Sequence, residues 1–235
     1  MKRRLLVVLV TSLLALGGCG LIWEPPPETK FADLSTKEML NTAERRVKDV
    51  DSVTVKGKGR EDGQSFRLNM KFAPNSSAGT VVVDGAAVKL LSVGDKTYMK
   101  ADEASYRRTG AVSGSPDDQK ILDLVADQWM DTRVWGFDDL AGYASRFGFF
   151  ADFTEPVGKV TQRPAQKVNG VLCIPLRDKE GTLYLDKRDG TPILLTRGGS
   201  SKERITFSYA PVAEFKHPSA ARIITKAEFK AALRR

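Results

Sequence analysis

Cys19 is the residue to which the sequence assigns the clearest chemistry. It follows basic residues at 2–4, an apolar run from Leu5 to Leu16, and the small residues Gly17 and Gly18. This order is typical of a secretory signal, and the apolar run is too short to span a bilayer as a stable helix. Residues Leu16-Gly17-Gly18-Cys19 also fit a lipobox. In a lipobox, the cysteine is acylated on its thiol and becomes the mature N-terminus.

The sequence therefore predicts a lipoprotein signal peptide at residues 1–18. It also predicts a diacylglyceryl group on Cys19, with palmitate among its acyl chains, that anchors an extracytoplasmic protein to the cell membrane. A single acyl chain binds a membrane only marginally, whereas two chains hold it stably. The alternative is an ordinary secretory signal in which Cys19 is incidental.

Cys173 and His217 are the remaining candidates for nucleophilic chemistry. Cys173 lies within the apolar segment Val171–Ile174, which favours a buried structural thiol. If Cys19 is acylated, Cys173 has no partner for a disulfide. A catalytic pair of Cys173 and His217 would need the two side chains to be adjacent and the thiol to be exposed and activated, and we do not expect it.

Other catalytic or metal-binding patterns are missing from the sequence. There is no Gly-x-Ser-x-Gly motif, and no His, Cys and carboxylate cluster has metal-ligand spacing. The pairs Asp117-Asp118 and Asp138-Asp139 stand at expected helix starts, where carboxylates complement the helix dipole. We therefore expect no enzyme, no catalytic residue, no metal and no cofactor.

The charge of the chain excludes one class of partner. The formal charge is +8, and loss of Lys2, Arg3 and Arg4 with the signal lowers it by three, to +5. There is no long basic run, and a nucleic-acid interface would need a basic stripe with motif support, so we expect no nucleic acid. A weak attraction to anionic membrane surfaces is compatible with this charge, although a solvated basic surface is the simpler interpretation.

The segment after the signal is predicted to be a stalk. Residues 19–33 contain Pro25-Pro26-Pro27, which favour an extended polyproline conformation. A helix should then open the folded domain, because Ser35 and Glu38 form a capping-box pattern.

Residues that alternate in polarity then indicate strands. Phe66, Leu68, Met70 and Phe72 alternate with polar residues, which is typical of a half-buried strand. Asp-Gly at 84–85 and Asn-Gly at 169–170 are strong hairpin signals. Two antiparallel meanders are therefore expected.

The middle of the chain is predicted to be helical. Ser115-Pro116 is typical of a helix start, and a second helix is expected from Phe137 or Asp138 through Phe147. The aromatic stretch from Trp129 to Phe153 either fills a core or forms the wall of an apolar cavity. The order of helix, strands, helices and strands predicts an α+β fold, a curved antiparallel sheet (half-barrel) wrapped around central helices. We assign this domain to residues 34–218 and a C-terminal tail to 219–235.

The chain resembles the LolA-like half-barrel carriers, in particular the actinobacterial LppX/LprG lipoproteins. The likeness lies in Val168-Asn169-Gly170-Val171, in Gly181–Asp186, in Asp189-Gly190-Thr191-Pro192 and in the final strand Ile205–Tyr209. It covers about Ser35 to Pro218. The resemblance implies an apolar cavity between sheet and helices that holds acyl chains of a lipid or lipoglycan.

Two functions follow as hypotheses. The first is a membrane-anchored lipoprotein that binds or transfers lipid. Its cavity wall, chosen by periodicity, would consist of Phe66, Leu68, Met70, Val83, Leu90, Leu122, Val125, Trp129 and Phe147. The second is a tethered interaction or signalling module with a solid core, whose protein partner the sequence does not identify.

Overall fold

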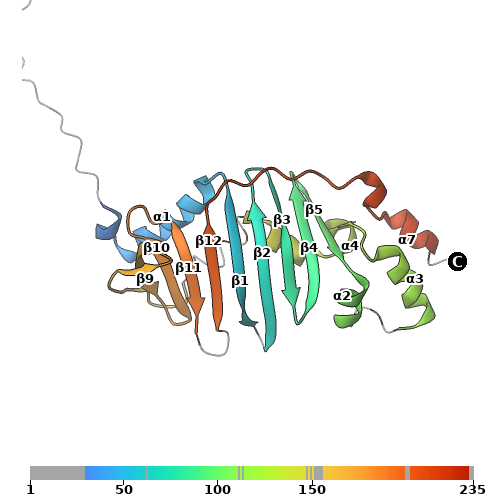
Figure 1. The fold of residues 1–235 in the computed structure, drawn as a ribbon, viewed down its shortest axis with the longest axis horizontal. Helices are drawn as coiled ribbons and strands as arrows, with labels where there is room; N and C mark the ends of the chain where they lie inside the picture. Colours follow the sequence, from blue (N-terminus) through green and yellow to red (C-terminus); the bar gives the residue numbers. More distant parts are fainter. Residues whose placement is uncertain are drawn as a thin grey trace, which may run out of the picture.

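A single antiparallel sheet, with helices behind it and beyond one of its edges, forms the frame of the protein (Figure 1). The computed structural model describes residues 30–61, 63–110, 112, 114–146, 148, 150, 156–198 and 202–232. Cys19 and Phe147 lie outside these residues. Among the described helices, none is long and apolar enough to cross a bilayer.

The sheet consists of two meanders joined at their first and last strands. The first contains β1 (Val53–Glu61), β2 (Gln64–Phe72), β3 (Ser76–Val83), β4 (Ala86–Val93), β5 (Lys96–Ala101) and β6 (Met130–Asp131). The second contains β7 (Thr161–Gln162), β8 (Gln166–Val168), β9 (Val171–Arg177), β10 (Gly181–Asp186), β11 (Pro192–Arg197) and β12 (Glu203–Ser208). Pairing of β1 with β12 gives the order β6-β5-β4-β3-β2-β1-β12-β11-β10-β9-β7, with β8 beside β9.

Both hairpin signals in the sequence form the turns they predict. Asp84 and Gly85 have φ of 46° and 86°, and Asn169 and Gly170 have φ of 50° and 85°. Two successive positive φ values are those of the type I′ turn, whose twist matches that of the flanking strands. These turns set the registers of β3 with β4 and of β8 with β9.

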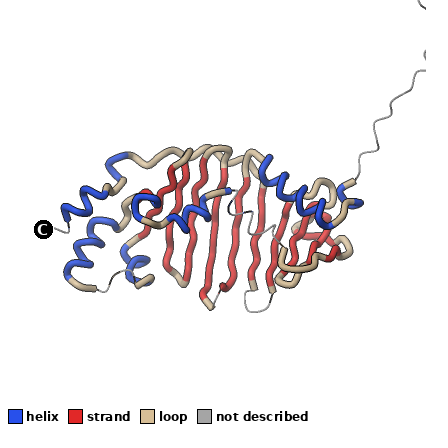
Figure 2. Tube along the Cα trace, turned by 180° about the vertical axis from the view of Figure 1, so that it is seen from behind, coloured by secondary structure: helices blue, strands red, loops and turns tan. Residues whose placement is uncertain are grey.

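The helices and 3-10 turns lie between and around the meanders. They are η1 (Phe31–Asp33), α1 (Thr36–Asp49), α2 (Glu103–Arg108), α3 (Pro116–Val125), α4 (Thr132–Trp135), α5 (Asp138–Ala144), η2 (Ala220–Arg222) and α7 (Lys226–Ala232). The capping box predicted for α1 is present, since Glu38 N donates to Ser35 Oγ at 3.3 Å and Ser35 N donates to Glu38 Oε2 at 2.9 Å. Figure 2 shows α1 and α5 on the same side of the sheet.

The sheet therefore has two different faces. We call the face under α1 and α5 the inner face and the opposite one the open face. Val55 of β1 and Leu68 of β2 point into the core on the inner face. Their neighbours in sequence, Lys56 and Arg67, are exposed on the open face. The α+β half-barrel fold class expected from the sequence is confirmed.

The chain after β12 forms a strap over the strand ends before it reaches α7 (Figure 1). Val212 N donates to Ser52 Oγ at 3.1 Å, and Phe215 N donates to Ser76 Oγ at 2.8 Å. Beyond the strap, Phe229 of α7 packs edge-on against Trp135 of α4, with ring centroids 4.6 Å apart. Part of the segment predicted to be a tail thus packs on the domain.

One apolar core unites these elements. Its buried members extend from Phe31 in η1 to Phe207 in β12, and Phe229 of α7 packs against them. All members of this core lie within residues 31–229, so the described part of the chain has a hydrophobic core of its own.

Candidate ligand site on the inner face

A row of residues directly paired across five strands forms the middle of the inner face. Met70 of β2 is opposite Gly79 of β3, Gly79 is opposite Leu90 of β4, Leu90 is opposite Met99 of β5, and Met99 is opposite Met130 of β6. We call these five residues the methionine row. All of its side chains are buried.

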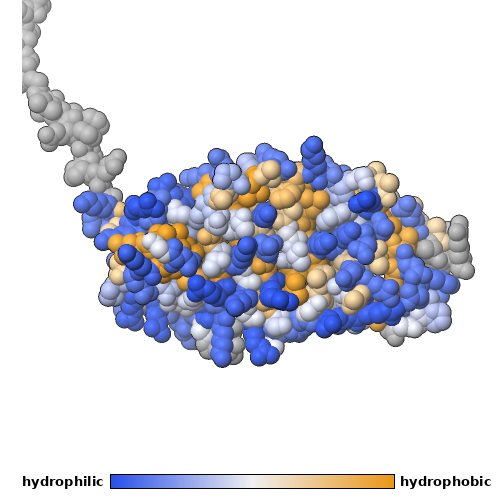
Figure 3. All heavy atoms as spheres, viewed as in Figure 1, coloured by the Kyte–Doolittle hydropathy of each residue, from blue (hydrophilic) through white to orange (hydrophobic). Residues whose placement is uncertain are grey.

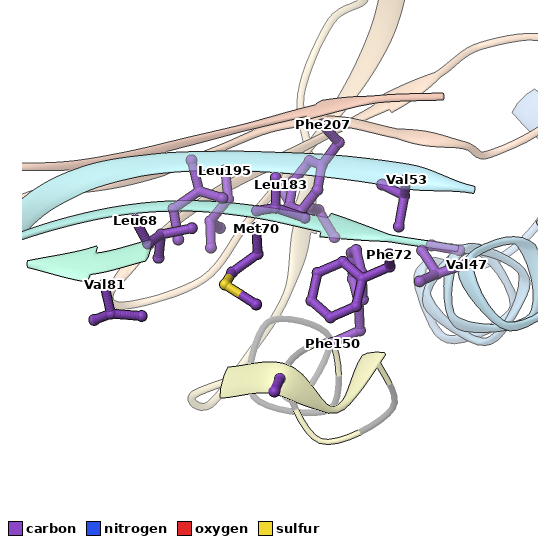
Figure 4. Close-up of a cluster of buried hydrophobic side chains, with 14 of the residues drawn as sticks. Val47, Val53, Leu68, Met70, Phe72, Val81, Phe150, Leu183, Leu195 and Phe207 are labelled. Atoms are coloured by element: carbon purple, nitrogen blue, oxygen red, sulfur yellow. The ribbon is translucent and has the colours of Figure 1, made fainter. Parts of the chain in front are cut away.

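The missing side chain at Gly79 leaves space for its neighbour Met70. A Cβ atom at this position would collide with Met70 Sδ and Asn69 O, and would lie 2.7 Å from Met70 Cα. The absence of a side chain therefore lets Met70 lie close against β3. Figure 4 shows the Met70 side chain pointing from β2 toward the segment that carries Phe150.

Helices α4 and α5 cover the row from the other side. Ser77 Oγ of β3 donates to Ala144 O at the end of α5 at 2.6 Å. Thr132 Oγ1 at the start of α4 donates to Thr97 O of β5 at 3.2 Å. Phe150 then packs on Phe207 of β12, with ring centroids 5.3 Å apart, so the cover continues over the central strands.

The structure brings together most of the residues predicted to line a cavity. Leu68, Met70, Leu90 and Val125 are buried in one cluster, and Phe66 packs against it. Leu122 of α3 is fully buried.

Two of the predicted wall residues, Val83 and Trp129, lie outside this buried cluster. Val83 lies on the inner face by its pairing with Phe66, but it is at the strand end and 39% exposed. Trp129 is partly buried, and its backbone forms a bridge to the chain before α7: Trp129 N donates to Arg222 O at 2.8 Å, and Ile224 N donates to Trp129 O at 2.9 Å.

Sequence reasoning missed several residues of this site. Met99 and Met130 sit in short strands with little periodicity, and Gly79 carries no apolar signal at all. Their importance comes from the register between strands.

One small cavity of the inner face lies away from the methionine row. This cavity, near α1, is lined by Leu40, Val160, Leu176, Leu183 and Leu195 together with polar residues, and its volume is about 30 Å³. This is room for a water molecule, whereas ligand pockets hold roughly 300–1,000 Å³. This cavity is therefore too small to hold an acyl chain.

Two buried donors beside the core lack hydrogen-bond partners among the described residues. They are the Tyr106 hydroxyl of α2 and the Trp135 Nε1 of α4. Burial raises the pKa of Tyr106 to about 12, so its hydroxyl remains a donor at physiological pH. An unsatisfied buried donor destabilises a fold by about 1–3 kcal/mol, which a ligand oxygen could recover.

The candidates for nucleophilic chemistry are far apart. Cys173 lies in β9, whereas the His217 Nδ1 contacts the hydroxyl of Tyr98 in β5 at 3.2 Å, near the other end of the sheet order. Burial, and then the charge of Asp186, raise the pKa of the Cys173 thiol. No group of His, Cys, Asp and Glu within the described ranges could hold a metal ion.

We expect Cys173 to react slowly with a thiol reagent in the folded protein and rapidly in denaturant, because its side chain is buried and its thiolate is disfavoured. Peptide mapping after labelling distinguishes Cys173 from any unacylated Cys19. Rapid native labelling of Cys173 at neutral pH would contradict the burial.

Several solved structures resemble this fold. LprF from Mycobacterium bovis is 13% identical over 75% of this chain and 94% of its own, with a TM-score of 0.46. A conserved protein from Thermus thermophilus is 11% identical over 81% of this chain and 99% of its own, with a TM-score of 0.43. MucB is 15% identical over 82% of this chain but only 63% of its own, with a TM-score of 0.39.

No protein-family model matches the sequence, and no curated protein is similar to it in sequence.

Proposed function

We propose that this protein is a membrane-anchored lipoprotein that binds acyl chains of a lipid or lipoglycan between the inner face and helices α4 and α5. The observation that carries the proposal is the methionine row beneath those helices. Methionine side chains are unbranched and re-pack easily, which suits a surface that must change shape around a ligand.

The cover over the row is suited to opening. Helix α4 has four residues and α5 has seven, and isolated helices this short are unstable in water. Their position therefore depends on contact with the row and the strands beneath it. A chain that enters would replace these contacts and return about 0.8 kcal/mol for each buried methylene group.

The two unpartnered donors support a ligand with a polar end. Tyr106 and Trp135 both pack against the core that contains the row. An ester or carboxyl oxygen could accept from either of them, while the acyl chain needs no directional contact. No cofactor or catalytic step is part of this function.

The anchor in this proposal is Cys19, which lies outside the described residues. The lipobox supports a diacylated protein on the extracytoplasmic side of the membrane, because two chains give stable attachment. The alternative function, a tethered interaction module, is favoured by one observation: the cavity of the inner face near α1 has a volume of only about 30 Å³.

Uptake of a fluorescent fatty acid by the lipid-extracted protein tests the acyl-chain site. We expect Leu90→Trp to lower uptake strongly, because the indole would occupy the centre of the methionine row. Lys89→Trp is the matched control, since its exposed side chain lies on the open face of the same strand. We expect it to bind as the unchanged protein does.

Native mass spectrometry of the protein purified from membranes supplies an independent test, since a carrier should retain lipid. Absence of co-purified lipid, together with no fatty-acid uptake by the unchanged protein, would leave the interaction module as the better explanation. Equal uptake by both tryptophan variants would place the ligand elsewhere.

A further inference from the structure

The open face carries a row of three cations on three neighbouring strands. Lys58 of β1 is directly paired with Arg67 of β2 on one side and with Arg204 of β12 on the other. All three side chains are exposed. Like charges directly opposite one another destabilise a sheet, so the stability of the fold does not explain this arrangement.

These cations line hollows in the surface. Together with Lys56, they line a trough of about 460 Å³. A second trough of about 350 Å³ adjoins it and is lined by Lys58, Arg67, Arg60 and Lys202. Figure 3 shows this side of the molecule, with hydrophilic residues over most of it and smaller apolar patches between them.

The strands supply no compensating acid to this part of the face. Within the described residues, Lys56, Lys58, Arg67 and Arg204 form no ion pair. The acidic residue of β12, Glu203, is buried and pairs with Arg197, with Nη1 and an Oε atom 3.4 Å apart.

The positive face continues across the first meander. Lys89 of β4 is directly paired with Lys100 of β5, and both positions belong to the open face. Asp127 offsets the charge of Lys100 only partly. Its Oδ1 lies 3.6 Å from Lys100 Nζ, and its carboxylate is exposed to solvent, where ion pairs are weak. The face is therefore broad and positive rather than a single basic spot.

We propose that the open face docks on the anionic phospholipid headgroups of the membrane that holds the anchor. Arginine and lysine donate charge-assisted hydrogen bonds to phosphate oxygens, and a broad sheet face matches a flat surface of repeated phosphates. No aromatic residue lines the larger trough, so it offers no platform for stacking bases, as single-stranded nucleic acid requires.

The length of the stalk makes this contact reachable. In the polyproline conformation that the sequence predicts, at about 3.1 Å per residue, residues 20–30 would reach roughly 35 Å. The anchor thus holds the domain close to the bilayer, where weak electrostatic attraction is sufficient for docking. The proposal relies on the anchor proposed above, but not on acyl-chain binding.

Co-sedimentation of residues 20–235 with vesicles tests the face without the acyl anchor. The probes are vesicles of phosphatidylcholine with 30% phosphatidylglycerol and vesicles of phosphatidylcholine alone. We expect binding to the anionic vesicles only, and its loss in high salt, because surface charges are then screened.

The variant K58Q/R67Q/R204Q removes the cationic row. Each basic residue near an anionic leaflet contributes about fivefold in partitioning, so the variant should bind on the order of 100-fold more weakly. The matched control K37Q/R45Q/K230Q removes three exposed cations of α1 and α7 and should change binding little. The first variant should melt no lower than the unchanged protein, because it relieves like-charge repulsion.

A second measurement uses the acylated full chain in the same vesicles. An environment-sensitive fluorophore is attached at Asn69→Cys on the open face or at Asn41→Cys on α1; both positions are exposed. We expect a blue shift at position 69 only, and only with phosphatidylglycerol.

Three outcomes with vesicles would overturn the proposal. They are equal binding to both kinds of vesicle, equal losses in the two triple variants, and a shift at position 41 instead of 69. Binding of soluble polyphosphate without binding of anionic vesicles would also overturn it, in favour of a soluble polyanion.

Discussion

Gly79→Val should prevent the protein from folding or lower its melting temperature by roughly 6–12 °C or more. This shift corresponds to a loss of about 3 kcal/mol in the free energy of unfolding of a domain of this size. Position 79 lies in the middle of the methionine row, where even a Cβ atom collides with Asn69 O and Met70 Sδ. One of these neighbours is backbone, so rotation of a side chain cannot relieve the strain. Overpacking of this kind usually destabilises by about 1–3 kcal/mol, and by more when the backbone must move.

The matched control is Gly142→Ala in α5. Nothing lies within 4 Å of a Cβ atom built there, and alanine favours a helix over glycine by roughly 1 kcal/mol. We expect this variant to melt at the same temperature or slightly higher. Circular dichroism during heating measures both variants. A stable Gly79→Val protein would show that Met70 does not lie against β3.

Met70→Ala should reduce the free energy of unfolding by about 2–5 kcal/mol, the usual range for removal of a large buried side chain. Met70 has no exposed surface, and the change would leave a cavity beside Gly79. Urea denaturation measures the loss. Lys71→Ala, an exposed position on the open face next in sequence, should stay within about 0.5 kcal/mol of the unchanged protein.

The Met70→Ala variant also distinguishes the two proposed functions. If the row is the floor of an acyl-chain site, a saturating fatty acid should raise the stability of Met70→Ala, because a ligand that binds only the folded state stabilises it. If the core is solid, the fatty acid should have no effect on the variant or on the unchanged protein. A loss below about 0.5 kcal/mol would contradict the packing of the row itself.

The sequence by itself determined the elements of this protein and their class. The capping residues Ser35 and Ser115 set the starts of α1 and α3, and the pairs at 84–85 and 169–170 set two hairpins. The alternation in β2 identified which of its residues face the core. These signals are local, because caps, turns and side-chain alternation depend on residues only a few positions apart.

Only the tertiary structure decided which residues of distant strands lie next to one another in the sheet. Lys56 and Thr206 are 150 positions apart, and nothing local in either strand specifies that β1 pairs with β12. That pairing places Arg204 beside Lys58, just as the register of β2 to β6 aligns the three methionines around Gly79 and Leu90. The packing of the interior was equally beyond the sequence, because the volume left between sheet and helices depends on how side chains from distant segments pack together.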